Sequence, residues 1–273
     1  MIAYLGPQGT FSHAAAIKFC PNEEQKAYAT IYAAIRAVST GEADGAIVPI
    51  ENSNEGSVNM TLDTLVQEDT LFITQEHLLK IRQNLITLPG IRKEQITEII
   101  SHPQAIGQCA RLLNHEFPNA VISFSDSTAK AAEAVLVSSG EVAMIGSEEC
   151  AAGHGLSILI PNCGDDPENT TRFIRIEKKQ FSGKNEPLKT SVAFTLPNTE
   201  GTLYQALSFF ARHHVNMIKI ESRPEKKHVG EYIFFVDVDG SLQDESLHTA
   251  MEALKNYATF FRFFGTYPKK GFG

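Results

Sequence analysis

The chain has 273 residues, of which 42% are hydrophobic, and a formal net charge of −8 at pH 7. This length holds one large or two modest domains, each able to bury a core of its own. The acidic balance argues against a nucleic-acid partner, because binding to a phosphate backbone needs a basic face. No apolar run approaches the ~20 residues of a membrane-spanning helix, so we expect no membrane partner.

The first residues and the cysteines indicate a compartment. The chain begins directly with MIAYLGPQGTF, where neither a secretory signal nor a transit peptide is recognisable. Cys20, Cys109, Cys150 and Cys163 have no CxxC or zinc-ligand spacing. Four free thiols without an export signal are typical of a reducing environment, and we expect a cytoplasmic protein.

Strand and helix patterns alternate through about residue 178. We expect strands at residues 2–5, 45–50, 97–101, 120–124 and 141–147, and helices at 11–19, 30–38, 57–69, 103–117 and 127–140. Such alternation predicts parallel α/β sheets, whose ligands bind beyond the carboxyl ends of the strands.

Residues 30–53 and 127–150 repeat one order of features. Each has a hydroxyl cap, an alanine-rich helix, a Gly-Glu break, an apolar strand and then an acidic loop. We interpret this echo as two similar lobes facing a cleft, although α/β units in general share such an order. Lobe one then comprises about residues 1–76 and 155–178, and lobe two about 77–154. The segments 71–88 and 157–178 would carry the chain between them.

The composition changes after residue 180. Residues 181–189 (FSGKNEPLK) are a polar linker with Gly and Pro, which is typical of a domain boundary. Beyond it, strands are expected at 190–196, 215–222, 230–240 and 259–268, with helices at 201–214 and 241–257. This βαββαβ order predicts an α+β ferredoxin-like domain over residues 189–273, with two helices on one face of the sheet. The other face needs cover, so we expect association with another chain.

Polar residues gather in loops that follow the predicted strands. GPQGTFS places Gln8, Thr10 and Ser12 at a helix start, where free N–H groups can meet an anion; an ordinary capped turn would look the same. PIENSNEGSV and SHPQAIGQC supply further hydroxyls, amides and carboxylates. Ser101 is the expected N-cap of the helix that follows it. His102 is a candidate base, but a lone histidine more often packs or forms a hydrogen bond, and Ser127 with Thr128 is first of all a helix cap.

In the stretch PENTTRFIRIEK, residues 167–178, the first half has residues typical of a turn, and the second half alternates apolar and charged residues as a strand does. Thr170, Thr171 and Arg172 lie where the two halves meet. No GxSxG elbow, dinucleotide fingerprint, Walker loop or HExxH zinc motif is present. Hydroxyls, amides, a carboxylate and an arginine suit the binding of a small carboxylate and hydrogen bonding to a leaving oxygen. They do not suit redox or phosphoryl transfer.

With these segments assembled, the chain resembles the prephenate dehydratase family over nearly its full length. GPQGTFS, PIENSNEGSV, SHPQAIGQC and NTTRF match the catalytic motifs of that family in order, and NMIKIESRP matches its ACT-type regulatory domain. The resemblance implies a two-lobed α/β catalytic domain over residues 1–180, similar to a periplasmic binding protein, followed by the ACT-type domain. It also implies conversion of prephenate to phenylpyruvate in phenylalanine biosynthesis, without cofactor or metal, in the monofunctional form of the enzyme.

The resemblance assigns roles to individual residues. Thr171 would be the hydroxyl aimed at the departing oxygen. Since a threonine hydroxyl is a very weak acid, Glu51 would be the alternative proton source if burial or substrate charge kept it protonated. The full implied set comprises the catalytic residues Thr171, Ser101, Gln108, Glu51 and Asn52, and the substrate-binding residues Gln8, Thr10, Ser53, Arg172 and Phe173. A strand-end ion pair is the other reading of Arg172.

The ACT-type region implies feedback by L-phenylalanine at an interface between paired domains, in a homodimer or homotetramer. The implied effector-binding residues are Gly201, Leu203, Asn216, Glu221, Ser222, Arg223 and Pro224. Thr202 and Ile218 depart from the residues usual in the family, which leaves the identity of the effector open. Arogenate dehydratase and a non-catalytic small-ligand sensor are the alternatives to prephenate dehydratase.

Overall fold

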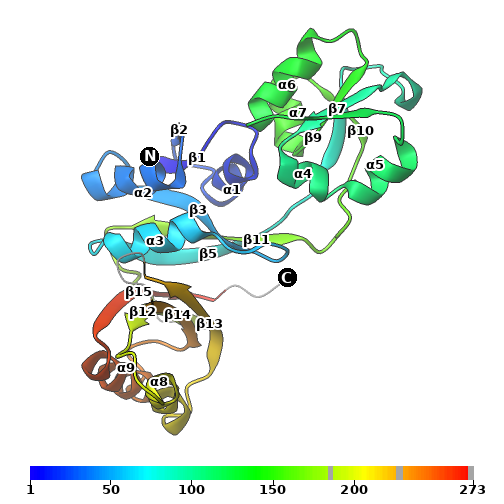
Figure 1. Ribbon diagram of the computed structural model, residues 1–273. Helices are drawn as coiled ribbons and strands as arrows, with labels where there is room; N and C mark the ends of the chain where they lie inside the picture. The colour runs from blue at the N-terminus through cyan, green and yellow to red at the C-terminus, as the bar shows by residue number, and fades with distance from the viewer. Residues whose placement is uncertain (184–186, 226–229, 270–273) are drawn as a thin grey trace.

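The computed structural model describes residues 1–183, 187–225 and 230–269. Three sheets organise these residues: one in each of two lobes and one in a C-terminal domain that lies against the first lobe (Figure 1). Within the described ranges, no helix combines the length and apolar character that crossing a membrane requires.

The first lobe is built on a sheet with the strand order β2-β1-β3-β11-β5, and the short β4 pairs with β3. β1 is parallel to β2 and β3, whereas β11 runs antiparallel between β3 and β5. The elements are β1 (Ile2–Leu5), α1 (Phe11–Phe19), β2 (Gln25–Tyr28), α2 (Ile31–Thr40), β3 (Gly45–Asn52), β4 (Gly56–Ser57), α3 (Asn59–Gln67), β5 (Phe72–Lys80) and β11 (Thr170–Glu177).

The second lobe has the strand order β10-β6-β9-β7-β8. β7 is parallel to β8 and β9, and β6 is antiparallel to β9 and β10. The elements are β6 (Asn84–Thr87), the 3-10 turn η1 (Lys93–Gln95), β7 (Glu98–Ser101), α4 (Pro103–Gly107), α5 (Ala110–Glu116), β8 (Val121–Phe124), α6 (Thr128–Val137), β9 (Val142–Gly146), α7 (Glu148–His154) and β10 (Ser157–Ile160).

The two sheets repeat one arrangement, so the prediction of two similar lobes is confirmed. Three parallel strands, β2-β1-β3 or β8-β7-β9, are followed by an antiparallel pair, β11-β5 or β6-β10. α2 with β3 and α6 with β9 take equivalent places, as the sequence echo indicated. The expectation of parallel sheets is wrong in this respect: both sheets are mixed, because each takes strands from the segments that cross between the lobes.

The crossings fall slightly later than the sequence suggested. β5 stays in the first sheet to Lys80, and β10 stays in the second sheet to Ile160 before β11 returns the chain. The acidic loop expected after residue 147 is instead the helix α7. Ser147 caps it, because its hydroxyl accepts the backbone N–H of Cys150 at 3.1 Å.

The C-terminal domain has the predicted βαββαβ order, with the spatial order β13-β14-β12-β15. Val192 and Phe194 pack under the two helices, while Ala193 between them faces the first lobe. The elements are β12 (Leu188–Thr195), α8 (Thr202–Arg212), β13 (Met217–Pro224), β14 (Tyr232–Asp239), α9 (Glu245–Tyr257) and β15 (Phe260–Pro268).

The first lobe covers the sheet face that the two helices leave open. Ala193, Phe235, Phe264 and Tyr267 share one apolar core with Ile73 of β5. The expectation that this face needs a second chain is therefore wrong: residues of the same chain bury it.

Candidate active site

A cleft of about 520 Å³ lies between the lobes, at the carboxyl ends of β1, β3, β7 and β9. Strand-to-helix turns from both lobes meet there, as the placement of the polar loops predicted. The lining side chains that bear polar groups are Thr10, Ser12, Asn52, Glu55, Ser57, Gln83, Ser101, His102, Gln104, Gln108, Asp126, Ser127, Thr128, Ser147 and Thr171.

Several of these groups lie at helix starts. Thr10 caps α1, since its hydroxyl accepts the backbone N–H of His13 at 3.2 Å. Ser127 caps α6 in the same way and lines the cleft together with Thr128. The N-terminal turns of these helices carry backbone N–H groups and the positive end of the helix dipole, which favour an anionic ligand.

Thr171 and Asn52 face each other across the β11–β3 ladder and both line the cleft. The Asn52 amide donates to the Thr171 hydroxyl at 2.9 Å and to Asn169 Oδ1 at 2.8 Å. Both residues are buried. A hydroxyl that accepts such a bond keeps its own proton for another acceptor, so Thr171 is prepared to donate into the cleft.

The second lobe presents Ser101 and two glutamines. Ser101 is buried, and its hydroxyl donates to the carbonyl of Ile145 at 2.7 Å. Gln108 accepts a hydrogen bond from Gln83 at 3.0 Å and donates to Glu55 at 3.1 Å. His102 is the N-cap of α4, where its Nδ1 accepts the backbone N–H of Gln104. The sequence suggested Ser101 as this N-cap; the structure instead ends β7 at Ser101 and gives the capping role to His102.

Phe173 is buried and lines the cleft from the same face of β11 as Thr171. Two other predicted substrate contacts are not brought into the cleft lining. Gln8 is exposed on the turn before α1. Ser53 is exposed too, and its hydroxyl accepts the backbone N–H of Thr170 at 3.0 Å, which ties the loop after β3 to β11.

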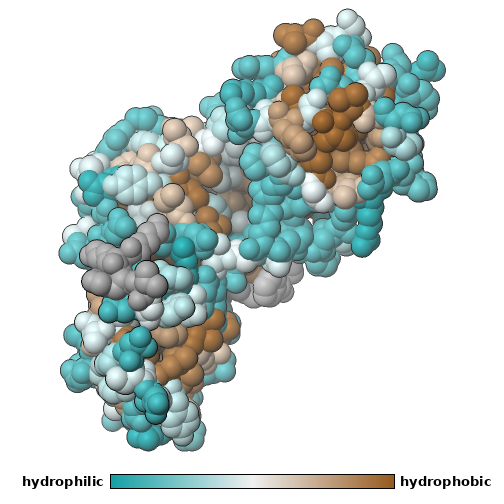
Figure 2. All heavy atoms as spheres, in the orientation of Figure 1, coloured by the Kyte–Doolittle hydropathy of each residue, from teal (hydrophilic) through white to brown (hydrophobic). Residues whose placement is uncertain are grey.

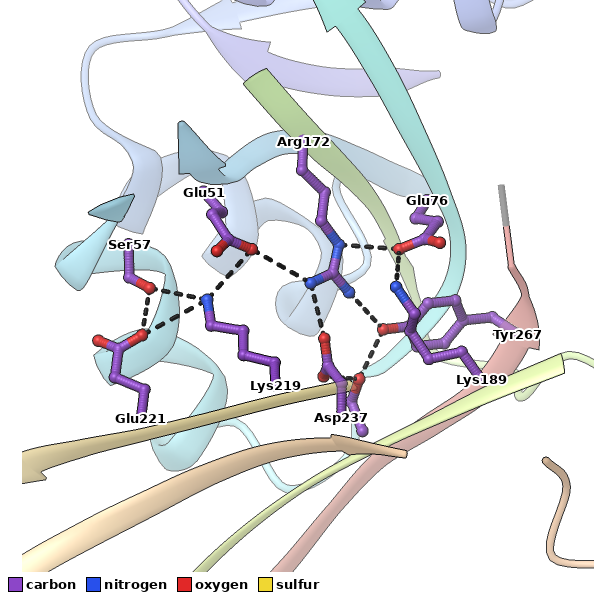
Figure 3. A network of polar contacts seen from close by, with 10 residues as sticks. Glu51, Ser57, Glu76, Arg172, Lys189, Lys219, Glu221, Asp237 and Tyr267 are labelled. Atoms are coloured by element: carbon purple, nitrogen blue, oxygen red, sulfur yellow. Dashed lines mark hydrogen bonds and ion pairs between the residues drawn. The ribbon is translucent and has the colours of Figure 1, made fainter. Parts of the chain in front are cut away.

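The structure places Arg172 and Glu51 outside the cleft lining. Arg172 alternates with Thr171 along β11, so it points away from the cleft, toward the C-terminal domain (Figure 3). Its guanidinium donates to Glu76 at 2.8 Å, to Asp237 at 2.7 Å and to Tyr267 at 2.8 Å. Arg172 therefore makes the ion pairs between the domains, and its side chain does not line the cleft.

Glu51 lies on the same far side of the sheet. One of its carboxylate oxygens is 3.5 Å from Arg172 and 3.2 Å from Lys219 of β13 (Figure 3). The neighbouring position Asn52 takes the cleft-facing side. Glu51 is thus not placed to supply a proton to a ligand in the cleft.

Burial shapes the electrostatics of this interdomain cluster. It opposes ionisation of Asp237, but the charges of Arg172 and Lys189, with a hydrogen bond from Ser191, outweigh it and hold the pKa of Asp237 below its ordinary value. Burial also raises the pKa of Tyr267, so this phenol stays protonated and can donate.

The predicted effector residues divide between the two faces of β13 and the start of α8. Glu221 contacts Ser57 and Lys219, and Arg223 donates to Asp63 at 2.6 Å, so both side chains engage the first lobe. Ser222 and Pro224 are exposed on the strand's other side, with the alternation that β13 shows throughout. Gly201 precedes α8 at φ 78°, Leu203 is half-buried, and Asn216 donates to Asp239 at 2.7 Å.

Sequence reasoning missed Glu55. It belongs to the PIENSNEGSV loop but was passed over in favour of Glu51, and the structure places it in the cleft beside Gln104 and Gln108. The usable signal was the length of the polar loop, which allows a residue beyond the strand end to turn back over the cleft.

Comparison with known proteins gives one family for the whole chain. The prephenate dehydratase family model matches residues 2–181, and the ACT domain model matches residues 190–256. Prephenate dehydratase of Lactococcus lactis subsp. lactis is 37% identical over 277 residues, covering 100% of this chain and 99% of that protein. The chloroplastic arogenate dehydratase/prephenate dehydratase 2 of Arabidopsis thaliana is 35% identical over 278 residues, covering 98% of this chain and 72% of that protein.

A solved structure agrees with this finding. The crystal structure of prephenate dehydratase from Arthrobacter aurescens in complex with L-Phe matches with a TM-score of 0.90 at 34% identity. The match covers 98% of this chain and 90% of that one.

Proposed function

The chain belongs to the prephenate dehydratase family, and from that premise we propose that its interlobe cleft converts prephenate to phenylpyruvate with Thr171 at the reacting centre. The enzyme is a carbon–oxygen lyase of phenylalanine biosynthesis, and its C-terminal domain is an ACT domain. Prephenate carries a ring carboxylate, a pyruvyl carboxylate and a ring hydroxyl. The hydroxyl must leave as water while the ring carboxylate leaves as carbon dioxide.

The polar groups of the cleft suit this substrate. The N-terminal turns of α1 and α6, with Thr10 and Ser127, offer donors to the carboxylates. Phe173 offers an apolar surface to the ring. Ser101 and Gln108 bind from the second lobe, so closure around the substrate would remove water from the carboxylate that is lost and favour decarboxylation.

One observation carries the proposal: the Thr171 hydroxyl lines the cleft with the Asn52 amide donating to it at 2.9 Å. This bond orients the oxygen and leaves the hydroxyl proton available for a hydrogen bond to the leaving group. Such a bond strengthens as negative charge develops on the departing oxygen, which is the condition for lowering the barrier.

Thr171→Ala is expected to lower kcat for phenylpyruvate formation by about 10²- to 10⁴-fold, the usual range for a positioned donor to a leaving group. Purified wild type and variant would be compared at saturating prephenate. Thr170→Ala is the matched control, because the neighbouring hydroxyl bonds only to the Glu168 carbonyl among the contacts described for it. Thr171→Ser should restore much of the rate. An alanine variant with wild-type kcat would remove Thr171 from the reaction.

Arogenate is the second candidate substrate, because the name of the Arabidopsis relative covers both activities. Arogenate carries an amino group where prephenate has a keto group. We expect kcat/KM to be higher for prephenate, and measuring both substrates with the same preparation decides between them. Substrate binding without turnover of either would instead support the sensor alternative.

L-Phenylalanine is the proposed effector, since the Arthrobacter relative was solved in complex with it. With Glu221 and Arg223 engaged by the first lobe, the proposed effector contacts are Gly201, Leu203, Asn216, Ser222 and Pro224. A second chain would complete this site along β13. Hydrophobic atoms appear on the side of this domain where β13 runs (Figure 2), and Ile218 and Ile220 are exposed there. Light scattering with and without phenylalanine tests for a homodimer or homotetramer.

A further inference from the structure

Glu55 belongs to the loop after β3 in the first lobe, and its side chain contacts the second lobe. Its Oε1 accepts hydrogen bonds from the side-chain amides of Gln104 at 2.5 Å and Gln108 at 3.1 Å. Its backbone N–H bonds to Asn52 Oδ1 at 3.2 Å. Asn52 therefore fixes the backbone of Glu55 with one end of its amide and orients Thr171 with the other.

The substrate brings negative charge to this carboxylate. The partners of Glu55 are neutral amides, which orient it without neutralising its charge. Glu55 is exposed before a substrate enters, and prephenate would place two further negative charges in the same cleft, where they repel this carboxylate. A nearby like charge favours the protonated form of a carboxyl group, so entry of the dianion favours proton uptake by Glu55.

We propose that Glu55 takes up a proton as prephenate binds and donates it to the leaving hydroxyl. This inference rests on the proposed function and supplies the proton source that Thr171, as a very weak acid, cannot be. The carbon–carbon bond to the ring carboxylate breaks, and its electron pair enters the ring. The ring carbon–oxygen bond breaks with its pair on oxygen, which takes the Glu55 proton and leaves as water.

The balance of the reaction agrees with this assignment. Prephenate with two negative charges and one proton gives phenylpyruvate with one negative charge, carbon dioxide and water. The proton that Glu55 gains on binding is thus the one that the reaction consumes. Glu55 ends as a carboxylate, ready to be protonated from solvent when the next substrate enters.

Other ionisable groups surround this site. His102 caps α4, which carries Gln104, and Asp126 lies just before the N-cap of α6, where Lys130 pairs with it at 2.7 Å. Behind the loop, Glu51, Lys219 and Glu221 face the opposite side of the β3–β4 hairpin. Any pH dependence therefore has to be assigned by substitution at Glu55, His102 and Asp126 separately.

Calorimetry measures the proton uptake directly. Prephenate would be titrated into the slow Thr171→Ala variant in two buffers of different ionisation enthalpy, with Glu55 either intact or replaced in Glu55→Gln. We expect uptake of about one proton when Glu55 is intact and none in the Glu55→Gln variant, because an amide has no carboxyl group to titrate. Asp126→Asn in the same background is the matched control and should leave the uptake unchanged. Equal uptake with and without Glu55 would overturn the proposal.

Steady-state kinetics distinguish two roles for Glu55: an acid in the reaction, or a residue that only connects the two lobes as a latch. Glu55→Gln is expected to lower kcat by about 10²- to 10⁴-fold and to abolish the fall of activity with rising pH that a required acid produces. His102→Gln should keep that fall. If Glu55→Gln changes only KM, with kcat and pH profile as in wild type, Glu55 is a latch and the proposal fails. Wild type inactive on prephenate would instead defeat the proposed function itself.

Discussion

At the scale of single residues, the Asn52 side chain connects two parts of the site, because its amide bonds both to residues at the start of β11 and to the loop after β3. Nδ2 donates to Asn169 and Thr171, while Oδ1 accepts the backbone N–H groups of Asn54 and Glu55. The first pair of bonds requires a donor, which asparagine has and aspartate lacks. The same residue thus fixes the hydroxyl on β11 and the loop that carries Glu55.

Asn52→Asp is expected to keep the loop but lose the donor to Thr171. Leaving a buried group without its partner costs about 1–3 kcal/mol, and the same loss in the transition state lowers kcat by about 5- to 150-fold. Steady-state kinetics on prephenate measure this. Asn162→Asp is the control, since Asn162 accepts a bond from Arg82 at an exposed position outside the cleft. If Asn52→Asp matched this control, Thr171 would need no donor.

At the scale of elements, β11 and β3 each serve two surfaces. Thr171 and Phe173 face the cleft and Arg172 faces the C-terminal domain; on β3, Asn52 and Glu51 divide in the same way. Opposite them, the ladder slips between Arg172 and Phe173, which pair with Glu51 and Pro49. A bulge of this kind next to an active site re-aims the side chains around it.

The sequence predicted these strands and loops but not which side of each strand meets the substrate. Alternation with a period of two identifies two faces, and a step of one residue exchanges them. Arg172 and Glu51 were therefore assigned to the cleft although their neighbours Thr171 and Asn52 occupy it. The face of the first-lobe sheet that lies away from the cleft is covered by β12, β14 and β15. These strands lie far along the chain, so no local sequence pattern reveals that packing.

The close approach of β15 to β5 gives a prediction about this packing. Gly265 has φ +144°, and a Cβ there would lie 2.4 Å from the carbonyl oxygen of Ile73. Gly265→Ala is expected to lower the free energy of unfolding by about 3 kcal/mol, because the clash is with backbone that cannot turn aside.

Gly90→Ala is the control for that variant. Gly90 also has a positive φ, +81°, but a Cβ there meets nothing within 4 Å. Only the backbone strain of about 1–2 kcal/mol applies there. Urea denaturation followed by circular dichroism compares the two, and equal losses would mean that the β15–β5 contact adjusts freely.

At the scale of the whole molecule, a cluster of charges joins the ACT domain to β3, β5 and β11 of the first lobe (Figure 3). Asp237 and Tyr267 bind Arg172, and Lys189 pairs with Glu76 at 2.7 Å. Lys219 reaches Glu51 and donates to the cleft residue Ser57 at 2.8 Å. Buried ion pairs are weak sources of stability compared with apolar packing, but their geometry is specific. A shift of β13 would therefore change the contacts of β3 and β4 directly.

This connection predicts which contact transmits feedback. Lys219→Met removes the contact between β13 and β3, and Glu51→Gln removes the negative charge from that contact. We expect each to reduce, by about 5-fold or more, the factor by which phenylalanine changes KM for prephenate, within the usual range of coupling between sites. The double variant should lose no more than Lys219→Met alone, because Lys219→Met already removes the contact with Glu51 together with the bond to Ser57.

Asp63→Asn separates this coupling from general weakening of the domain interface. It disturbs the pair with Arg223, at 2.6 Å, which also joins β13 to the first lobe but ends on α3 and not on β3 or β11. Phenylalanine binding, measured by calorimetry, should persist in all these variants. If Asp63→Asn lowered the coupling as much as Glu51→Gln, any loosening of the interface would suffice. The specific route through Glu51 and Lys219 would then be wrong.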